Sequence, residues 1–106
     1  MRTSIVLTTY NAGSHLKGQL DSLRNQTLPP NEVLIFDDGS TDRTVEYITQ
    51  YVRAYGLDHW KIQVNRENLG WKRNFMEGLH RASGEILFPC DQDDVWYPEK
   101  IQEMTS

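Results

Sequence analysis

The segment FPCDQDDVW, residues 88–96, joins an apolar run to three carboxylates within four positions. The run begins at Ile86 and Leu87 and is typical of a buried strand. Carboxylates this close together repel one another, so a fold keeps them together only where a cation neutralises them or water solvates them. A buried strand delivers them at its carboxyl end, where open α/β sheets bind ligands. The segment therefore favours a binding site over a polar turn.

The donor atoms of this segment indicate which ion would bind. Carboxylate oxygens are hard ligands that suit Mg²⁺ or Mn²⁺, and these ions commonly bind beside substrate phosphates. We expect a divalent ion on Asp93, helped by Lys72 and Arg73 at the start of a predicted helix, where the helix N-terminus also attracts anions. Taken alone, Lys72 and Arg73 are more typical of a solvated helix face.

The composition is that of one globular domain, with 106 residues, 38% hydrophobic and 25% charged. The net charge of −4 gives no broad positive surface, so we expect no nucleic-acid partner. The single cysteine, Cys90, excludes an internal disulfide and is expected to be a buried thiol in a reducing cytoplasm. No run of about 18 apolar residues and no basic-then-apolar leader occurs, so we expect neither a membrane span nor a signal peptide.

Apolar runs typical of buried strands alternate with amphipathic helical patterns. Strands are expected at residues 4–9, 32–36, 60–64 and 85–91. The apolar faces of the three intervening helices are expected to be Leu16, Leu20 and Leu23; Val45, Ile48, Val52 and Tyr55; and Trp71, Phe75 and Leu79. This order with short connections predicts an α/β fold of three layers, with helices on both faces of a mainly parallel sheet and strand 4–9 inside it.

Local signals refine the helices. Ser40 or Thr41 is expected to cap the second helix, and Asp42 suits its positive N-terminus. Gly78 lies on the apolar face of the third helix, where a glycine costs about 1 kcal/mol relative to alanine, so we expect close backbone packing there. Pro98 is expected in the first turn of a last helix that opens at residues 97–100.

Polar side chains follow three of the expected strands: Tyr10 and Asn11, Asp37 and Asp38, and residues 91–94. Because the carboxyl ends of parallel strands share one edge, the three clusters are expected to converge on one crevice. There Asp38 can accept the imide N–H of uracil or thymine, and Tyr10 can offer its ring to a base. The alternatives are a turn residue for Asp38 and a half-buried aromatic for Tyr10.

Other nucleotide-binding classes have less support. No G-x-G-x-x-G follows the first strand and no G-x-x-x-x-G-K-[ST] occurs, so dinucleotide and P-loop sites are disfavoured. A nucleotidyltransferase remains an alternative, although residues 10–16 are not the glycine-rich basic loop that it would need. A receiver-like signalling domain would need a strand ending in lysine, which is not found. A nucleotide- or nucleotide-sugar-binding module without transferase activity is a further alternative.

Four motifs follow one another along the chain: IVLTTYN at 5–11, DDGSTD at 37–42, ENLG at 67–70 with RN at 73–74, and DQDD at 91–94. In this order they make the chain resemble the family 2 glycosyltransferases of GT-A fold. The resemblance covers essentially the whole chain. It implies a GT-A, Rossmann-like fold that stops soon after the D-x-D motif. Residues 1–106 would then be the nucleotide-sugar-binding half, and the acceptor half with the catalytic base would lie beyond Ser106.

The resemblance also implies metal-dependent, inverting transfer of a sugar from a UDP- or dTDP-linked donor. Tyr10, Asn11 and Asp38 would surround the base and ribose. Asp91 and Asp93 would form the D-x-D, with Asp93 the direct ligand of Mn²⁺ or Mg²⁺. The remaining donor-binding residues that it implies are Thr9, Gly70, Lys72, Asn74 and Gln92.

The sequence DQDDVW at 91–96 is similar to that of enzymes of bacterial surface-polysaccharide assembly, including rhamnosyltransferases. This similarity implies transfer of a hexosyl or rhamnosyl group to a glycan or lipid-linked acceptor. The expected location is the cytoplasm, or the inner face of the membrane for a full-length enzyme. The 106-residue chain alone is expected to be inactive, because general-base assistance and acceptor placement would be missing.

Overall fold

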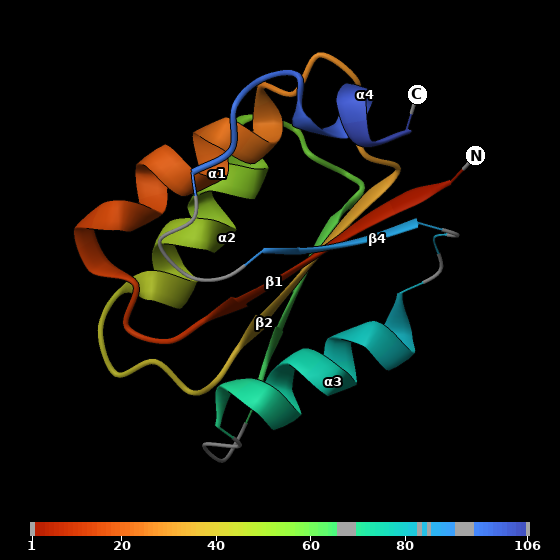
Figure 1. Cartoon of the computed structure of the whole chain (residues 1–106). Helices are drawn as coiled ribbons and strands as arrows, with labels where there is room; N and C mark the ends of the chain where they lie inside the picture. The colour runs from red at the N-terminus through yellow and green to blue at the C-terminus, as the bar shows by residue number, and fades with distance from the viewer. Residues whose placement is uncertain (1, 66–69, 83, 85, 91–94, 106) are drawn as a thin grey trace.

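The computed structural model describes residues 2–65, 70–82, 84, 86–90 and 95–105 (Figure 1). Within them lie four strands, β1 (Thr3–Thr9), β2 (Glu32–Asp37), β3 (Trp60–Val64) and β4 (Ile86–Cys90). They pair in the order β3-β2-β1-β4, and every pairing is parallel. The parallel sheet with β1 inside it confirms the predicted fold class.

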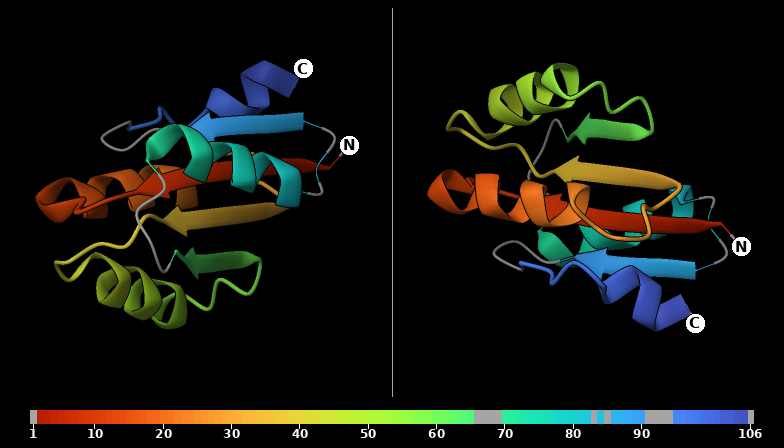
Figure 2. Two further views of the ribbon diagram at one scale, coloured as in Figure 1. Left: turned by 90° about the horizontal axis from the view of Figure 1, so that it is seen from below. Right: turned by 90° about the horizontal axis from the view of Figure 1, so that it is seen from above.

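Helices cover both faces of this sheet (Figures 1 and 2). The elements α1 (Leu16–Arg24), α2 (Thr44–Ala54) and α4 (Lys100–Thr105) lie over one face, and α3 (Trp71–Arg81) lies over the other. A short 3₁₀ turn, Gly13–His15, precedes α1. In the part of the chain that the structure describes, no helix has the length and apolar character to cross a membrane.

The alternation of side chains along β1 explains the three layers. Ile5 and Leu7 join the core under α1 and α2, while Val6 joins the cluster under α3. Successive side chains of a strand point to opposite faces, so a strand that is covered on both sides is apolar throughout. The predicted leucine stripe of α1 is buried in the larger core, and so is Cys90, as expected.

The buried face of α2 differs from the prediction. Tyr55 was expected on it but is 51% exposed, whereas Tyr51 is buried. The buried residues are Thr44, Ile48 and Tyr51. Tyr51 can be buried because its hydroxyl donates to Asp21 Oδ1 at 2.6 Å and accepts from Arg24 Nε at 2.9 Å. The prediction considered apolar spacing alone and missed a tyrosine whose polar atom finds partners on α1.

The start of α2 also corrects the prediction. The helix begins at Thr44, and neither Ser40 nor Thr41 caps it. Instead Asp42 Oδ1 accepts the Thr44 N–H at 2.9 Å. The hydrogen bonds from the hydroxyl and then from the N–H of Thr44 hold the pKa of Asp42 below its ordinary value. Asp42 therefore lies just before the positive helix end, as expected, and its side chain accepts the first N–H of the helix.

Helix α4 begins at Lys100, so Pro98 precedes the helix and does not lie in its first turn as predicted. The carbonyl oxygen of Pro98 accepts the N–H of Thr27 at 2.8 Å, and Ile101 is fully buried in the larger core. These contacts attach the last described segment to the same sheet face as α1.

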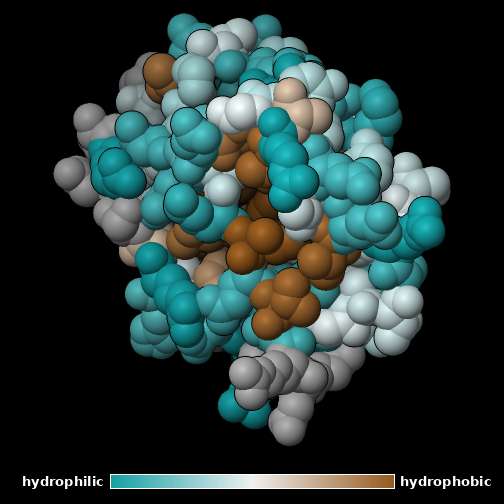
Figure 3. Space-filling model, turned by 180° about the vertical axis from the view of Figure 1, so that it is seen from behind, coloured by the Kyte–Doolittle hydropathy of each residue, from teal (hydrophilic) through white to brown (hydrophobic). Residues whose placement is uncertain are grey.

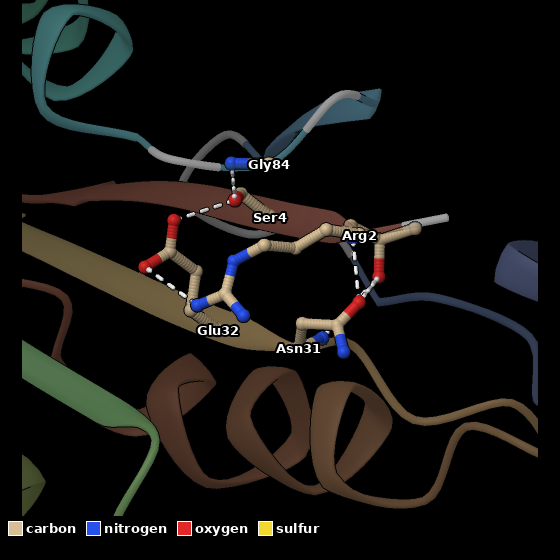
Figure 4. Close-up of polar contacts among 6 residues, drawn as sticks. Arg2, Ser4, Asn31, Glu32 and Gly84 are labelled. Carbon is tan, nitrogen blue, oxygen red and sulfur yellow. Dashed lines mark hydrogen bonds and ion pairs between the residues drawn. The ribbon is translucent and has the colours of Figure 1, made fainter.

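Two glycines allow close approach to the sheet. A Cβ at Gly78 would lie 2.5 Å from Val6 Cγ1, which confirms the predicted backbone packing of α3. A Cβ at Gly84 would lie 2.7 Å from the Ser4 nitrogen, and the Gly84 N–H donates to Ser4 Oγ at 2.8 Å (Figure 4). Ser4 Oγ in turn donates to Glu32 Oε1 at 2.6 Å, so the amino-terminal end of the sheet is held by internal hydrogen bonds.

In the described part of the chain, β3 is the edge strand opposite β4, and only one of its sides is paired with another strand. Seen from behind, apolar side chains gather around a hollow in the middle of the molecule (Figure 3). A pocket on β2 and β3 is lined by Leu34, Ile35, Phe36, Lys61, Ile62, Gln63 and Arg81. The Arg81 guanidinium donates to Gln63 Oε1 at 2.6 Å, and such charged groups discourage pairing with another strand.

Candidate functional site

The strands β1 and β2 end side by side at the carboxyl edge of the sheet. Thr9 is paired with Asp37, and the Asp38 N–H donates to the Thr9 carbonyl oxygen at 2.9 Å. Cys90, at the end of β4, is paired with Leu7, two residues before the end of β1. Two of the three predicted polar clusters are therefore adjacent. The third cluster, residues 91–94, lies outside the described residues.

All four acceptor positions of the Asp37 carboxylate are taken by hydrogen bonds within the chain. Its side chain is fully buried, and Oδ1 accepts hydrogen bonds from Thr9 Oγ1 at 2.7 Å and Ser40 Oγ at 2.6 Å. Oδ2 accepts the N–H groups of Gly39 at 3.1 Å and Ser40 at 2.8 Å. Four donors match the roughly four acceptor positions of a carboxylate. Asp37 thus shapes the loop after β2, and the hydroxyl of Thr9, a predicted donor-binding residue, is committed to it.

Asp38 lies at the junction of three elements. Its residue is 4% exposed, Oδ1 accepts from Asn65 Nδ2 at 3.1 Å, and Oδ2 accepts the Gly70 N–H at 2.9 Å. Gly70 has φ of 82°, in the left-handed region that favours glycine. The carboxylate is therefore held between the residue that follows β3 and the residue that precedes α3, next to the end of β1.

Asn65 is the site residue that the sequence analysis missed. Its backbone N–H donates to the Asp37 carbonyl oxygen at 2.8 Å, and its Nδ2 also donates to Asn74 Oδ1 at 2.6 Å. Asn74, a predicted donor-binding residue, is fully buried and donates from Nδ2 to the Phe36 carbonyl oxygen at 2.7 Å. The available signal was an asparagine directly after a predicted strand, the position that Asp38 occupies after β2.

Tyr10 and Asn11 follow β1 at the same edge. Tyr10 is 42% exposed. Asn11 has a positive φ of 47°, and its Oδ1 accepts the N–H of Thr41 at 2.8 Å and that of Asp42 at 3.3 Å. The Asn11 N–H donates to Ser40 Oγ at 2.9 Å. Asn11 therefore joins the loop after β1 to the loop after β2 and fixes the backbone next to Tyr10.

Lys72 and Arg73 lie in the first turn of α3, and both are exposed. They line a surface hollow whose other residues are Met76, Glu77 and His80. This stripe is the outer side of α3, as the solvated-face alternative predicted. A role for Lys72 in phosphate binding stays a prediction.

The predicted metal ligands, Asp91 and Asp93, lie outside the described residues together with Gln92. Among the residues that the structure does describe, no group of three or more His, Cys, Asp or Glu side chains could hold a metal ion. His15, His59 and His80 are exposed. The D-x-D site therefore stays a prediction.

Comparisons with known proteins agree on one family. The family described as glycosyl transferase family 2 matches residues 4–106. An uncharacterized glycosyltransferase of Nostoc sp. is 35% identical over 104 residues, which are 98% of this chain and 32% of that protein. The poly(ribitol-phosphate) beta-N-acetylglucosaminyltransferase TarS of Staphylococcus aureus is 30% identical over 97% of this chain and 18% of its own length.

Solved structures give the same answer. TarS 1–349 in complex with UDP-GlcNAc has a TM-score of 0.88 at 28% identity and covers 99% of this chain and 30% of that one. The mannosyltransferase PcManGT from Pyrobaculum calidifontis, in complex with GDP-Man and Mn²⁺, has a TM-score of 0.83 at 26% identity and covers 90% of this chain and 28% of that one. These matches confirm the predicted GT-A fold. The chain spans about a third or less of these proteins.

Proposed function

Because this chain belongs to glycosyltransferase family 2, we propose that it binds the donor, a UDP- or dTDP-linked sugar, within a longer glycosyltransferase. The observation that carries this proposal is the placement of Asp38. Its carboxylate is held by Asn65 and Gly70 at the carboxyl edge of the sheet, next to the end of β1, where Tyr10 is partly exposed. Open α/β sheets bind their ligands at this edge.

The chemistry of a carboxylate suits uracil and thymine. Both bases carry an imide N–H at N3, whereas cytosine presents an acceptor there, so an acceptor-only side chain such as Asp38 distinguishes them. The ring of Tyr10 offers a face for stacking. The complex of TarS with UDP-GlcNAc supports a uridine donor, and the GDP-Man complex of PcManGT makes guanine the base to test against it.

The proposed metal ligands are Asp93 and Asp91, which follow β4 in the sequence. Carboxylate oxygens suit Mn²⁺ and Mg²⁺, and the Mn²⁺ in the PcManGT complex supports a divalent ion. Such an ion would offset the charge that develops on the departing diphosphate. Lys72, Gly70 and Gln92 would contribute to the rest of the donor site. Asn74, which is fully buried and bonded to Asn65 and to the Phe36 carbonyl oxygen, would support the site from the interior.

The acceptor and the reaction type are proposed for the longer enzyme. We assign it to inverting transfer of a hexosyl or rhamnosyl group onto a bacterial surface polysaccharide. The name of TarS, a poly(ribitol-phosphate) beta-N-acetylglucosaminyltransferase, supports a polymer as the acceptor. The catalytic base and acceptor site would lie beyond Ser106, and the enzyme would act in the cytoplasm or at the inner face of the membrane.

Calorimetric titration of the chain with UDP, dTDP, CDP, GDP and ADP, with and without Mn²⁺, tests the donor assignment. We expect Mn²⁺ to strengthen binding of UDP and dTDP, with weak binding of the other three. Equal binding of all five nucleotides would overturn the assignment of the base to Asp38. Tighter binding of GDP would replace the pyrimidine donor with a purine one.

A radiolabelled-donor assay against mixed glycan acceptors tests whether this chain only binds the donor or also carries the catalytic base. The 106-residue chain should transfer no sugar, because base assistance is worth about 10²–10⁴-fold and acceptor placement adds to it. Slow donor hydrolysis is the most that we expect. Robust transfer by this chain would show that the base lies within it. Release of pyrophosphate from a nucleoside triphosphate would instead support a nucleotidyltransferase.

A further inference from the structure

A chain of hydrogen bonds, part-buried at Asn65 and buried at Asn74, runs behind Asp38. Asn65 Nδ2 donates to Asp38 Oδ1 at 3.1 Å and to Asn74 Oδ1 at 2.6 Å. Asn74 Nδ2 then donates to the Phe36 carbonyl oxygen at 2.7 Å. Asn74 is fully buried, so the chain is anchored in the interior between β2 and α3. It ends at the carboxylate that the proposed function assigns to the nucleotide base.

The direction of these bonds requires an amide at both positions. The amino group of Asn65 has two N–H bonds, and each meets an oxygen acceptor, one of Asp38 and one of Asn74. Asn74 must accept at one atom and donate at the other, which only an amide of this size can do. An aspartate at either position would donate nothing and would place two oxygens against each other.

The hydrogen bonds to Asp38 limit rotation of its carboxylate. The terminal torsion of an aspartate is broad, so the fold alone does not fix the plane of its oxygens. Here the two oxygens are held by donors from different elements, Asn65 after β3 and Gly70 before α3. Loss of either donor leaves the plane free to turn, and a turned carboxylate no longer meets the N–H of a base in line.

We propose that Asn65 is a positioning residue that sets the preference for uracil or thymine by fixing the plane of the Asp38 carboxylate, with Asn74 holding Asn65 in place. This inference rests on the proposed function. A merely structural role for the Asn65 side chain is the alternative. The two are separable, because the Asn65 N–H, which donates to the Asp37 carbonyl oxygen, is kept in any substitution other than proline.

The test compares Asn65→Ala with a matched control, Asn31→Ala. Asn31 Oδ1 accepts the Thr3 N–H at 2.7 Å, so this asparagine also holds a strand end, but at the opposite end of the sheet (Figure 4). Calorimetry with UDP and CDP, each with Mn²⁺, and the melting temperature are measured for both variants and the unchanged chain. We expect Asn65→Ala to weaken UDP binding about tenfold, as for a lost hydrogen bond to a charged group. CDP binding should barely change, so the preference for UDP falls, and Asn31→Ala should keep that preference.

The outcomes separate this inference from the proposed function. If Asn65→Ala only lowers the melting temperature and keeps the preference of the unchanged chain for UDP, the positioning role is wrong. If Asn65→Ala does not fold, Asn65→Ser is measured in its place, because the smaller polar side chain of serine leaves room for water to reach Asn74. The melting temperature and the preference for UDP over CDP are then compared in the same way. An unchanged chain that does not prefer UDP overturns the proposed function first, and the positioning role with it.

Discussion

The N–H of Asp38 donates to the carbonyl oxygen of Thr9 at 2.9 Å, in the first step past the end of the paired strands β1 and β2. This single bond brings the two polar loops of the carboxyl edge together. Asn11 then joins the same loops through Ser40, Thr41 and Asp42. The backbone around Asp38 is therefore fixed by the fold before any ligand binds, which limits the ordering cost of binding.

Replacement of Asp38 by alanine should weaken binding of UDP by about tenfold or more, because a hydrogen bond to a charged group is lost. Binding of the metal should persist, since the proposed ligands are Asp91 and Asp93. Calorimetry with UDP, CDP and Mn²⁺ measures both effects. Asp58→Ala, which removes an exposed carboxylate before β3, serves as the control. An unchanged ratio of UDP to CDP affinity would contradict base recognition by Asp38 and favour the alternative that it is only a turn residue.

Asp93→Asn should remove most of the Mn²⁺ enhancement of UDP binding, since the charge of the proposed ligand is lost while its shape is kept. The melting temperature without metal should not fall below that of the unchanged chain, because the charge belongs to a binding site and its loss relieves repulsion among neighbouring carboxylates. Titration of UDP at increasing Mn²⁺ measures the enhancement, with Asp58→Asn as the control. Full enhancement in Asp93→Asn would place the ion on other residues.

Two helical glycines should respond to alanine in opposite ways. In α3, a methyl group at Gly78 would meet Val6 Cγ1 at 2.5 Å, so Gly78→Ala should lower the free energy of unfolding by about 1–2 kcal/mol despite the better helix propensity of alanine. In α1, a methyl group at Gly18 would meet no atom within 4 Å, so Gly18→Ala should raise it by about 0.5–1 kcal/mol. Urea unfolding gives both values. A stabilised Gly78→Ala variant would contradict the close packing of α3 on the sheet.

The Tyr51 hydroxyl should add a pH dependence to stability. Its hydrogen bond, followed by that of Lys17, holds the pKa of Asp21 below its ordinary value of 3.8. A depressed carboxyl pKa stabilises the folded state above the ordinary value, and the effect is lost as the pH falls through the folded-state pKa. The melting temperature of Tyr51→Phe should therefore lie below that of the unchanged chain at pH 7, and the gap should narrow toward pH 2. Parallel melting curves across this range would contradict the link to Asp21.

The sequence predicted what periodicity and strand ends determine. The alternation of apolar runs with helical patterns predicted which segments are strands and which are helices. It also predicted the three layers, because a strand that is buried on both faces is apolar along its whole length. It could not give the pairing of Tyr51 with Asp21 and Arg24, which depends on two helices meeting in space. The Tyr55 prediction was wrong for this reason.

The candidate site divides in the same way. Asp38 could be found because a carboxylate at a strand end is visible in the sequence. Asn65 could not, since its importance comes from Asn74, nine residues further on, and from the carboxylate after a different strand. The sequence also could not show that Asp37 and Asp38 have different roles. Only the structure shows that the four acceptor positions of Asp37 are taken by Thr9, Gly39 and Ser40.

The most direct measurement is a titration of the ¹⁵N-labelled chain with UDP and Mg²⁺, followed in amide correlation spectra. Donor binding at the carboxyl edge predicts that the largest shift changes fall on residues 9–11, 38–40, 65 and 70. The amides of residues 31–33, at the other end of β2, should barely move. Shift changes centred on that opposite end, or no changes at saturating UDP, would contradict binding of the nucleotide beside Asp38.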